Sequence, residues 1–146
     1  MKVRAVMSQC VISVQRPDTI HKAAALMHVH DIGSLPVIDG RDPVGMLTDR
    51  DLVLRVLCSD PQTCALTVGE VMSPDPITCE AHQSVMEAAA IMGDAQIRQL
   101  LVVDDAGEPV GMLSIGDIAE HVSEKLAGQA LGEIVEGRRK RSPLVR

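Results

Sequence analysis

The sequence has no phenylalanine, tyrosine or tryptophan among its 146 residues. Because 46% of the residues are nonetheless hydrophobic, a buried core is feasible, and it must be built from aliphatic side chains and the eight methionines. Proteins that hold single-stranded nucleic acid commonly stack its bases on aromatic rings. The absence of such rings therefore argues against a stacking platform.

Long apolar runs and a secretion signal are also missing. No stretch approaches about 18 uninterrupted apolar residues, and the opening sequence MKVRAVMSQC has no apolar segment of the kind a signal peptide needs. We therefore expect a soluble, cytoplasmic protein that makes no membrane contact. The four cysteines form no C-x-x-C pair, so we expect reduced thiols that serve in packing.

Recognisable catalytic motifs are absent. The stretch MLSIG around Ser114 is not the G-x-S-x-G of a nucleophile elbow, and neither the phosphate loop G-x-x-x-x-G-K-[ST] nor the metal-binding H-E-x-x-H occurs. His21 and His28 share one face of an expected helix, but no cysteine or carboxylate completes a familiar ligand spacing. The sequence therefore predicts neither an enzyme nor a metal site.

Negative charge dominates except at the end of the chain. The net charge is −6, yet the last nine residues, RRKRSPLVR at 138–146, hold five basic groups and no acidic one. The rest of the chain therefore carries −11, from 9 basic and 20 acidic groups. A basic end of this kind is typical of a solvated, disordered tail, and it also occurs where a protein contacts nucleic acid. We expect 138–146 to be disordered.

Nearly the whole chain repeats itself. The phrase PVGMLTDRD at 43–51 returns as PVGMLSIGD at 109–117, and VRAVMS at 3–8 returns as VGEVMS at 68–73. Order, spacing and chemical character agree between the two copies. The chain therefore divides into a first repeat, a linker, a second repeat, a helical extension and the basic tail, at 1–58, 59–65, 66–122, 123–137 and 138–146.

Each copy predicts the same order of elements, β-α-β-β-α. The first copy has an early strand, an alanine-rich helix, two strands around a turn and a closing helix at 10–14, 18–30, 34–38, 43–47 and 49–57. The second copy has the same elements at 76–79, 83–94, 99–103, 109–113 and 115–126. The expected fold class is α/β (α+β), with two pseudo-symmetric repeats packed through their sheets. Pro36 places its strand at an edge or an irregularity.

The repeated phrase keeps a hydroxyl and a carboxylate three residues apart, as Thr48 with Asp51 and as Ser114 with Asp117. One interpretation is a capping box at the start of each closing helix. The other adds a ligand, because free N–H groups at a helix start suit an anion and a nearby carboxylate can accept both hydroxyls of a ribose. Capping does not require the glycine inside each phrase, which would let a planar base approach the backbone.

Two tandem units that contain VMS, an alanine run, DIGSLPVID and PVGMLTDRD resemble a pair of CBS domains, which are named after cystathionine β-synthase and together form a Bateman module. The resemblance covers residues 1 to about 122. It implies that the strand pairs of the two repeats meet across a cleft with up to two adenosine sites. It also implies that Thr48 with Asp51, and Ser114 with Asp117, hold ribose hydroxyls.

The same resemblance assigns residues around these hydroxyl–carboxylate pairs. Those just before the middle strand would line the pockets, namely Gly33 and Ser34 in the first copy and Arg98 and Gln99 in the second. The early strands would touch the base through backbone groups near Ser13 and Thr78.

The two copies carry an arginine at different places. The first has Asp49 and Arg50 inside its phrase, whereas the second has Arg98 before its middle strand. Because a guanidinium suits phosphate, we predict that Arg50 and Arg98 contact phosphates, and simple surface solvation is the alternative for either. The second phrase has Ile115 and Gly116 instead, which leaves open that only one site is competent or that an uncharged ligand binds there.

These observations predict a stand-alone regulatory module that is not an enzyme. It would bind an adenosine-containing small molecule, namely AMP, ADP or ATP, with NAD and S-adenosylmethionine left open, and it would require no cofactor. Binding would shift the packing of the two halves and so modulate an unknown partner protein. The resemblance implies a homodimer.

Two alternatives stay open. A dimeric scaffold or nucleic-acid-binding protein would act through the basic tail at 138–146, although nucleic acid is not the partner we expect. A redox or metal sensor would act through cysteine and histidine.

Overall fold

The computed structural model of the chain describes residues 1–58 and 66–141, with side chains up to Gly137. The chain forms two compact units. The first-repeat unit consists of residues 12–76, and the second-repeat unit consists of residues 1–11 together with those from 77 onward. The expected linker at 59–65 lies outside the described part. The expectation that 138–146 is disordered is wrong for 138–141, which form the end of helix α6 (Glu124–Arg141), and 142–146 lie outside the described part.

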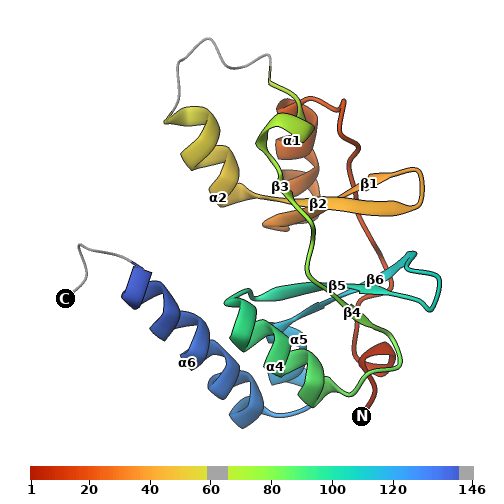
Figure 1. Ribbon diagram of the computed structural model, residues 1–146, viewed down its shortest axis with the longest axis vertical. Helices are drawn as coiled ribbons and strands as arrows, with labels where there is room; N and C mark the ends of the chain where they lie inside the picture. The colour runs from red at the N-terminus through yellow and green to blue at the C-terminus, as the bar shows by residue number, and fades with distance from the viewer. Residues whose placement is uncertain (59–65, 142–146) are drawn as a thin grey trace. The chain divides into compact units, whose positions relative to one another are not determined.

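The first-repeat unit contains a three-stranded antiparallel sheet in the order β1-β2-β3 (Figure 1). Its helices bury their apolar side chains against one face of this sheet, in a core that contains Ala23, Leu35, Val37 and Leu47. Its elements in chain order are α1 (Ile20–His30), β1 (Ser34–Asp39), β2 (Asp42–Thr48), α2 (Asp49–Asp51), the π-helix η2 (Leu52–Leu57), α3 (Val68–Val71) and β3 (Ser73–Pro74).

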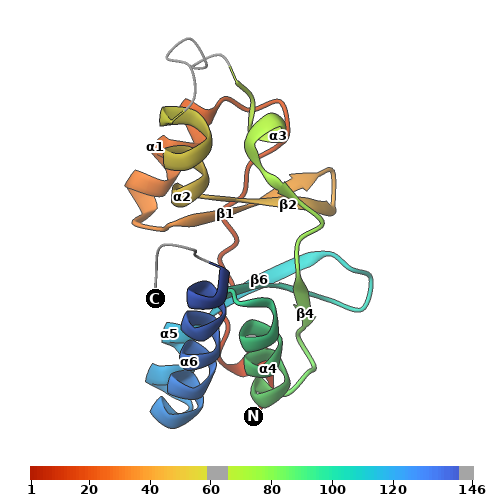
Figure 2. The same ribbon diagram turned by 60° about the vertical axis from the view of Figure 1, so that its left-hand side comes forward.

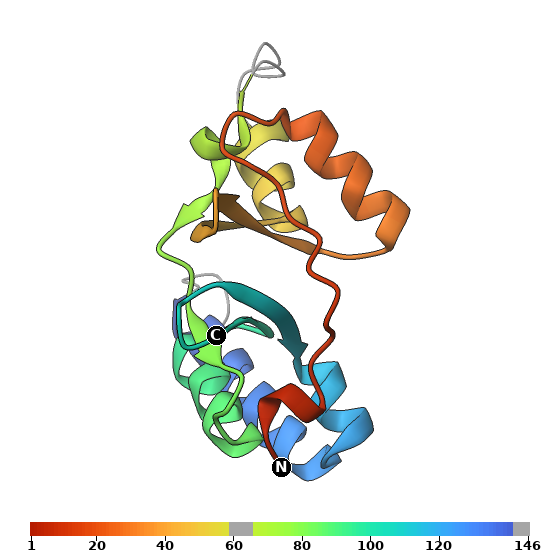
Figure 3. The same ribbon diagram turned by 90° about the vertical axis from the view of Figure 1, so that its right-hand side faces the viewer.

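The second-repeat unit contains a three-stranded sheet in the order β4-β5-β6, with β4 parallel and β6 antiparallel to β5. Figure 3 shows the helices of this unit gathered on one face of its sheet. Its elements are the 3-10 helix η1 (Val3–Ala5), β4 (Thr78–Glu80), α4 (Val85–Ala95), β5 (Gln99–Val103), β6 (Pro109–Ser114), α5 (Ile115–His121) and α6 (Glu124–Arg141). The mixture of helices and small sheets confirms the α+β class that the sequence predicts.

The opening turn of each sequence copy belongs to the unit of the other copy. VRAVMS at 3–8 lies in the second-repeat unit, where Ser8 N donates to Met112 O over 2.8 Å and Met112 N donates to Ser8 O over 2.9 Å. VGEVMS at 68–73 lies in the first-repeat unit, and β3 at its end pairs with β2. The compact units are therefore not the contiguous copies of the sequence.

The early segment of the first copy is not the strand that we expect at 10–14. It makes only an isolated parallel bridge, in which Val14 N donates to the Pro36 carbonyl over 3.1 Å and Ile38 N donates to the Val14 carbonyl over 2.9 Å. Pro36 has no N–H to continue the ladder toward the N-terminus. The equivalent residue of the second copy, Leu101, has one, and there β4 forms over three residues.

Side-chain caps explain where the two alanine-rich helices begin. The Thr19 hydroxyl accepts a hydrogen bond from Lys22 N (3.0 Å) at the start of α1, and the Ser84 hydroxyl accepts one from Glu87 N (3.1 Å) at the start of α4. Buried side chains recur every three or four residues along both helices, as an amphipathic helix requires.

The closing helices differ from the prediction. After Thr48 the chain forms the single α-turn α2 and then the π-helix η2, and not one uniform α-helix over 49–57. In the second-repeat unit the helix predicted at 115–126 is two helices. The break lies at Ser123, because its hydroxyl accepts a hydrogen bond from Leu126 N (3.2 Å) and so caps the new helix α6.

Helix α6 runs along α4 and also packs against α5 (Figure 2). Ala127, Ala130 and Ile134 are buried on its inner face. Gly137 contacts Gln96 so closely that a Cβ at position 137 would overlap the Gln96 side chain. The helical extension of the sequence is therefore part of the core of this unit.

Among the helices of the described ranges, none combines the length and the apolar character that crossing a lipid bilayer would require.

Candidate functional site

The predicted ligand-binding residues of the first repeat gather where β1 begins and β2 ends. Ser34 and Thr48 are direct partners in the antiparallel ladder. The next residue, Asp49, donates its N–H to the Gly33 carbonyl over 2.9 Å. This pairing places Gly33, Ser34, Thr48 and the turn that starts at Asp49 side by side at one end of the strand pair.

Thr48 and Asp51 form a capping box. The Thr48 hydroxyl accepts a hydrogen bond from Asp51 N (3.1 Å), and Oδ2 of Asp51 accepts one from Thr48 N (2.9 Å). Both residues are half-buried. The structure thus confirms the capping interpretation of the repeated phrase, and the box orients the Asp51 carboxylate at the end of β2.

The second-repeat unit has the same construction. Gln99 pairs with Ser114 across β5 and β6, and Ile115 N donates to the Arg98 carbonyl over 2.9 Å. The Ser114 hydroxyl accepts from Asp117 N (3.0 Å), while Oδ2 of Asp117 accepts from both Ser114 N and the Ser114 hydroxyl, each over 2.8 Å. Each unit therefore carries one candidate half-site with the same hydroxyl and carboxylate.

The two helix starts differ in their free N–H groups. In the first-repeat unit Asp49 N donates to a backbone carbonyl, Arg50 N donates to Oδ1 of Asp49 (2.8 Å), and the box uses the other two amides. The expectation of free amides for an anion is therefore wrong there. In the second-repeat unit Ile115 has no carboxylate, and Gly116 N has no hydrogen-bond partner among the residues that the structure describes.

The two carboxylates also differ. Oδ1 of Asp51 lies 3.7 Å from Nε of Arg55, one turn further along the chain. In the second repeat the position equivalent to Arg55 is His121, which lies 3.8 Å from Glu120 instead. Within the described ranges, Oδ1 of Asp117 has neither a hydrogen bond nor an ion pair. The Asp117 carboxylate thus keeps one oxygen available for a ligand.

Arg55 is a site residue that the sequence reasoning missed. Its Nε atom lies near Asp51, and its Nη1 atom donates a hydrogen bond to the Val71 carbonyl (2.8 Å). An aspartate and an arginine four residues apart in an expected helix are a known ion-pair spacing, so the signal was present in the sequence. The contact with Val71 joins residues 16 apart, and no local pattern indicates it.

The two predicted phosphate-binding arginines, Arg50 and Arg98, are both exposed. Neither guanidinium makes a hydrogen bond or an ion pair with any residue of the described ranges. The position before the middle strand, Gly33 in the first repeat and Arg98 in the second, has different surroundings in the two repeats. A Cβ at Gly33 would lie 3.1 Å from Oδ2 of Asp49, whereas Arg98 accepts a backbone hydrogen bond from Ile115, which carries no charge. The same corner of the site is therefore acidic in the first repeat and basic in the second.

Ser13 and Thr78, which we expect near the base, lie away from the helix starts. Thr78 begins β4 and pairs with Leu101, two residues along β5 from Gln99. Ser13 is exposed and precedes the bridge between Val14 and Val37. In its own unit, each residue lies on the segment that pairs with the middle strand, β1 for Ser13 and β5 for Thr78. This pairing does not bring either residue to a capping box.

The structure gives the glycines of the repeated phrase a packing role. A Cβ at Gly45 would lie 2.6 Å from Sδ of Met72 and 2.7 Å from the Ser73 carbonyl oxygen. At Gly111 the matching distances are 2.6 Å to Sδ of Met7 and 2.7 Å to the carbonyl oxygen of Ser8. The space where these side chains would lie is filled by the neighbouring segment, so the expectation that a base approaches there is wrong.

Cysteine and histidine do not converge in the described ranges, where no three histidine, cysteine, aspartate or glutamate side chains gather as metal ligands. Cys10 and Cys58 are exposed thiols in different units. Burial raises the pKa of the Cys79 thiol to about 11, so it stays protonated at neutral pH.

Known proteins resemble this chain in sequence and in fold. The CBS domain-containing protein YhcV of Bacillus subtilis (strain 168) is 38% identical over 135 residues, which cover 90% of this chain and 94% of that protein. A crystal structure of Hypoxic Response Protein I with two coordinated zinc ions matches with a TM-score of 0.74 at 34% identity, over 84% of this chain and 99% of that chain.

Two further solved structures that match this chain hold adenosine compounds. CBSX2 in complex with AMP has a TM-score of 0.72 at 26% identity, over 85% of this chain and 97% of that chain. The CBS domain pair of protein MJ0100, in complex with 5′-methylthioadenosine and S-adenosyl-L-methionine, has a TM-score of 0.74 at 26% identity, over 82% of this chain and 98% of that chain.

The family model of the CBS domain matches this chain twice, over residues 3–57 and 68–124. Each match contains one capping box and the strand pair that precedes it. The protein therefore belongs to the CBS domain family, with two CBS domains in tandem.

Proposed function

We propose that the protein is a regulatory module that binds an adenosine-containing nucleotide at its CBS domains and thereby modulates a separate protein. Support comes from the two matching structures that hold AMP, or 5′-methylthioadenosine with S-adenosyl-L-methionine. It also comes from the residues of this chain, which place a hydroxyl, a carboxylate and an exposed arginine around one helix start. CBS domains are usually regulatory, and on this basis we infer a sensor and not an enzyme.

The observation that carries the proposal is the unengaged pair of groups in the second-repeat unit. Oδ1 of Asp117 and the N–H of Gly116 have no partner among the described residues, although both belong to the start of α5. A carboxylate oxygen accepts hydrogen bonds and an amide donates them, so together they fit a ribose diol and an adjacent phosphate oxygen.

Individual roles follow from the positions. Ser114 and Asp117 would hold the ribose hydroxyls, and the exposed Arg98 would contact the phosphate. Gln99 and the backbone near Thr78 would face the base. Because AMP carries one phosphate for one arginine, it is the ligand that we test first, with ADP, ATP, NAD and S-adenosylmethionine as the comparison panel.

The first-repeat unit offers a half-site of lower affinity. Thr48, Asp51, Gly33 and Ser34 take the matching positions, with Ser13 on the neighbouring segment. Asp49 already occupies the amide of Arg50 (2.8 Å), and Arg55 faces the Asp51 carboxylate (3.7 Å). A ligand must displace these contacts, whereas the second-repeat unit requires no such displacement.

Calorimetric titration tests the proposal, because a chain without tryptophan or tyrosine has no useful intrinsic fluorescence. We expect saturable binding of AMP and a loss of affinity worth about 1 to 3 kcal/mol on Asp117→Asn, from one lost charge-assisted bond. The matched change Asp51→Asn should have a smaller effect. Binding of no member of the panel by the unaltered protein would contradict the proposal.

The change in packing of the two units, the homodimer, the cytoplasmic location and the regulated partner stay predictions. A ligand shifts a conformational equilibrium only as far as it prefers one state, so regulation requires a measurable difference in affinity between states. Light scattering with and without AMP measures the mass of the assembly. A mass equal to one chain under both conditions would contradict the homodimer.

A further inference from the structure

Within the described ranges, Arg55 is the one cation that contacts Asp51 or Asp117, the two carboxylates expected to hold a ribose, and its only signal in the sequence is the four-residue spacing from Asp51. We propose that Arg55 lowers the affinity of the first-repeat half-site by occupying the Asp51 oxygen that a ribose hydroxyl needs. This inference rests on the proposed function, since it concerns the affinity of the same ligand. Its consequence is that the two CBS domains fill in order, the second-repeat half-site first.

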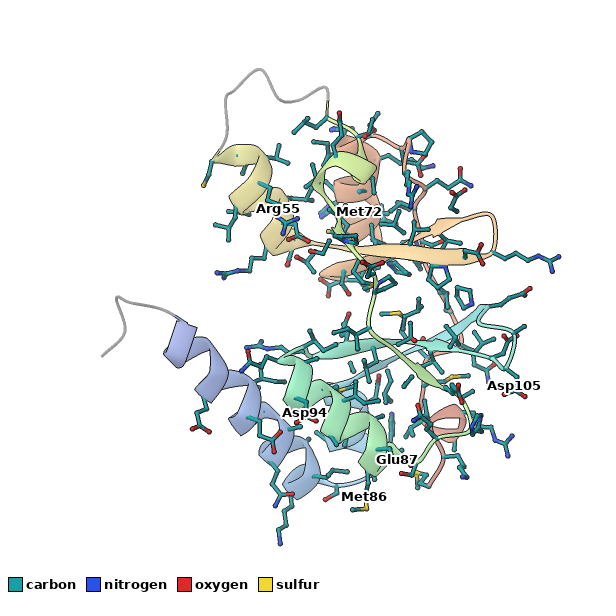
Figure 4. All side chains as sticks on the ribbon, viewed as in Figure 1. Arg55, Met72, Met86, Glu87, Asp94 and Asp105 are labelled. Atoms are coloured by element: carbon teal, nitrogen blue, oxygen red, sulfur yellow. The ribbon has the colours of Figure 1, made fainter. Side chains whose placement is uncertain are left out.

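The contacts of Arg55 hold its side chain over the carboxylate. Nη1 donates to the Val71 carbonyl over 2.8 Å and lies 3.4 Å from the Met72 carbonyl, while Nε lies 3.7 Å from Oδ1 of Asp51. Figure 4 shows the Arg55 side chain directed toward the segment that carries Met72. Because the end of α3 anchors one side of the guanidinium, the other side stays beside Asp51.

The Asp51 carboxylate is thereby used on both oxygens. Oδ2 accepts the Thr48 amide of the capping box (2.9 Å), which the fold requires, and Oδ1 faces Arg55. The Asp51 side chain is 15% exposed, so a ligand hydroxyl reaches it only where Arg55 leaves room. A ribose that binds here must therefore compete with the guanidinium for Oδ1.

The second repeat shows the same site without this competitor. Asp117 has an equivalent capping box, and His121 occupies the position of Arg55. His121 is half-exposed and lies near Glu120, not near the box carboxylate. The contrast between Arg55 and His121 is therefore an internal control for the effect of a cation one turn after the box.

Uncharged adenosine is the probe that isolates the competition. Removal of Arg55 also removes a positive charge, which by itself weakens the binding of any phosphate. Adenosine carries no phosphate, so only the release of the Asp51 oxygen changes its affinity. AMP serves as the second probe, and its gain should be smaller than that of adenosine.

The titration uses the protein with Asp117→Asn, which weakens the second-repeat half-site, and the part of the remaining binding that is lost on adding Asp51→Asn is assigned to the first-repeat half-site. In this background Arg55→Met should raise the affinity for adenosine about two- to five-fold, the range expected for one exposed ion pair. Arg55→Lys keeps a cation beside Asp51 and should leave the affinity close to that of the parent. In a chain that also carries Asp51→Asn, Arg55→Met should have no effect.

The reciprocal change is His121→Arg in an otherwise unaltered chain. It places a guanidinium one turn after Asp117 and should weaken adenosine binding at the second-repeat half-site by a similar factor. Thermal unfolding by circular dichroism accompanies each titration, so that a loss of folding is not counted as a change in affinity. His121→Arg also keeps the inference testable if Arg55→Met fails to fold.

The outcomes separate this inference from the proposed function. The role of Arg55 is overturned if neither Arg55→Met nor His121→Arg changes the affinity for adenosine. If the same binding is lost when Asp117→Asn and Asp51→Asn are combined, the adenosine site itself stands. An equal gain from Arg55→Met with and without Asp51→Asn also overturns it, since the effect would not act through Asp51. Absence of binding in the unaltered chain overturns both.

Discussion

Gly111→Ala should destabilise the second-repeat unit because the added methyl group has no room. Its carbon would lie 2.6 Å from Sδ of Met7 and 2.7 Å from the Ser8 carbonyl oxygen. The methionine side chain can turn aside. The carbonyl cannot, because Ser8 and Met112 exchange two backbone hydrogen bonds of 2.8 and 2.9 Å. Overpacking of this kind costs about 1 to 3 kcal/mol, and the fixed carbonyl places the expected loss near 2 kcal/mol.

Urea unfolding followed by far-ultraviolet circular dichroism measures this loss. Gly45→Ala, with the same 2.6 and 2.7 Å contacts to Met72 and Ser73, should destabilise the first-repeat unit by a similar amount. Gly128→Ala is the control, because a Cβ there has nothing within 4 Å, and a helical alanine should stabilise α6 by up to about 1 kcal/mol.

The opposite pattern would refute the packing argument. If Gly111→Ala unfolded at the same urea concentration as the parent but no longer bound AMP, the glycine would serve the approach of a base, as the repeated phrase alone indicates. Loss of stability that is larger for Gly128→Ala than for Gly111→Ala would also contradict the structure.

Three further predictions concern pH and folding. Burial raises the pKa of Cys79 from 9.0 to about 11, so between these pH values the native state keeps a proton that the unfolded chain has lost. The free energy of unfolding should therefore fall as pH rises from about 9 to about 11. The melting temperature of Cys79→Val should not show this fall. The amide of Gln15 donates to Asp18 and lowers the pKa of that carboxyl. The ionised carboxylate should therefore stabilise the fold above the unfolded pKa near 3.8, and this stabilisation should be lost as pH falls below that value. Melting temperatures of Asp18→Asn in acid check this. A fragment of residues 12–76 contains every element of the first-repeat unit, whereas 1–58 lacks β3; circular dichroism should show more cooperative unfolding for 12–76, and equal behaviour would contradict the exchanged turns.

Local spacing explains what the sequence could predict. The hydroxyl and carboxylate three residues apart identified both capping boxes, and the alanine-rich helices follow from periodic apolar residues between good caps. The strand pairs were equally clear, because each is two short apolar runs around a turn. These features depend on contacts between residues close in sequence, which a pattern records directly.

Features that depend on contacts between residues far apart in the chain could not be predicted from the sequence. The opening turns at 3–8 and 68–73 look like parts of their own copies, and only tertiary pairing assigns each to the other unit. Arg55 anchors to Val71 across a stretch that no periodicity connects. The glycines of the repeated phrase are explained by a neighbouring segment that fills the space beside them, whereas the sequence alone favoured a ligand at that position.

The amide spectrum of the protein tests the central claim most directly. In a ¹⁵N–¹H correlation spectrum titrated with AMP, the account predicts a saturable shift of the Gly116 signal, because its N–H has no partner within the described ranges and lies at the start of α5. The Arg50 signal should shift less and at higher AMP concentration, since Asp49 already accepts its N–H. A spectrum in which AMP leaves Gly116 and Asp117 unmoved, or moves only the signals of the first-repeat helix start, would contradict the account.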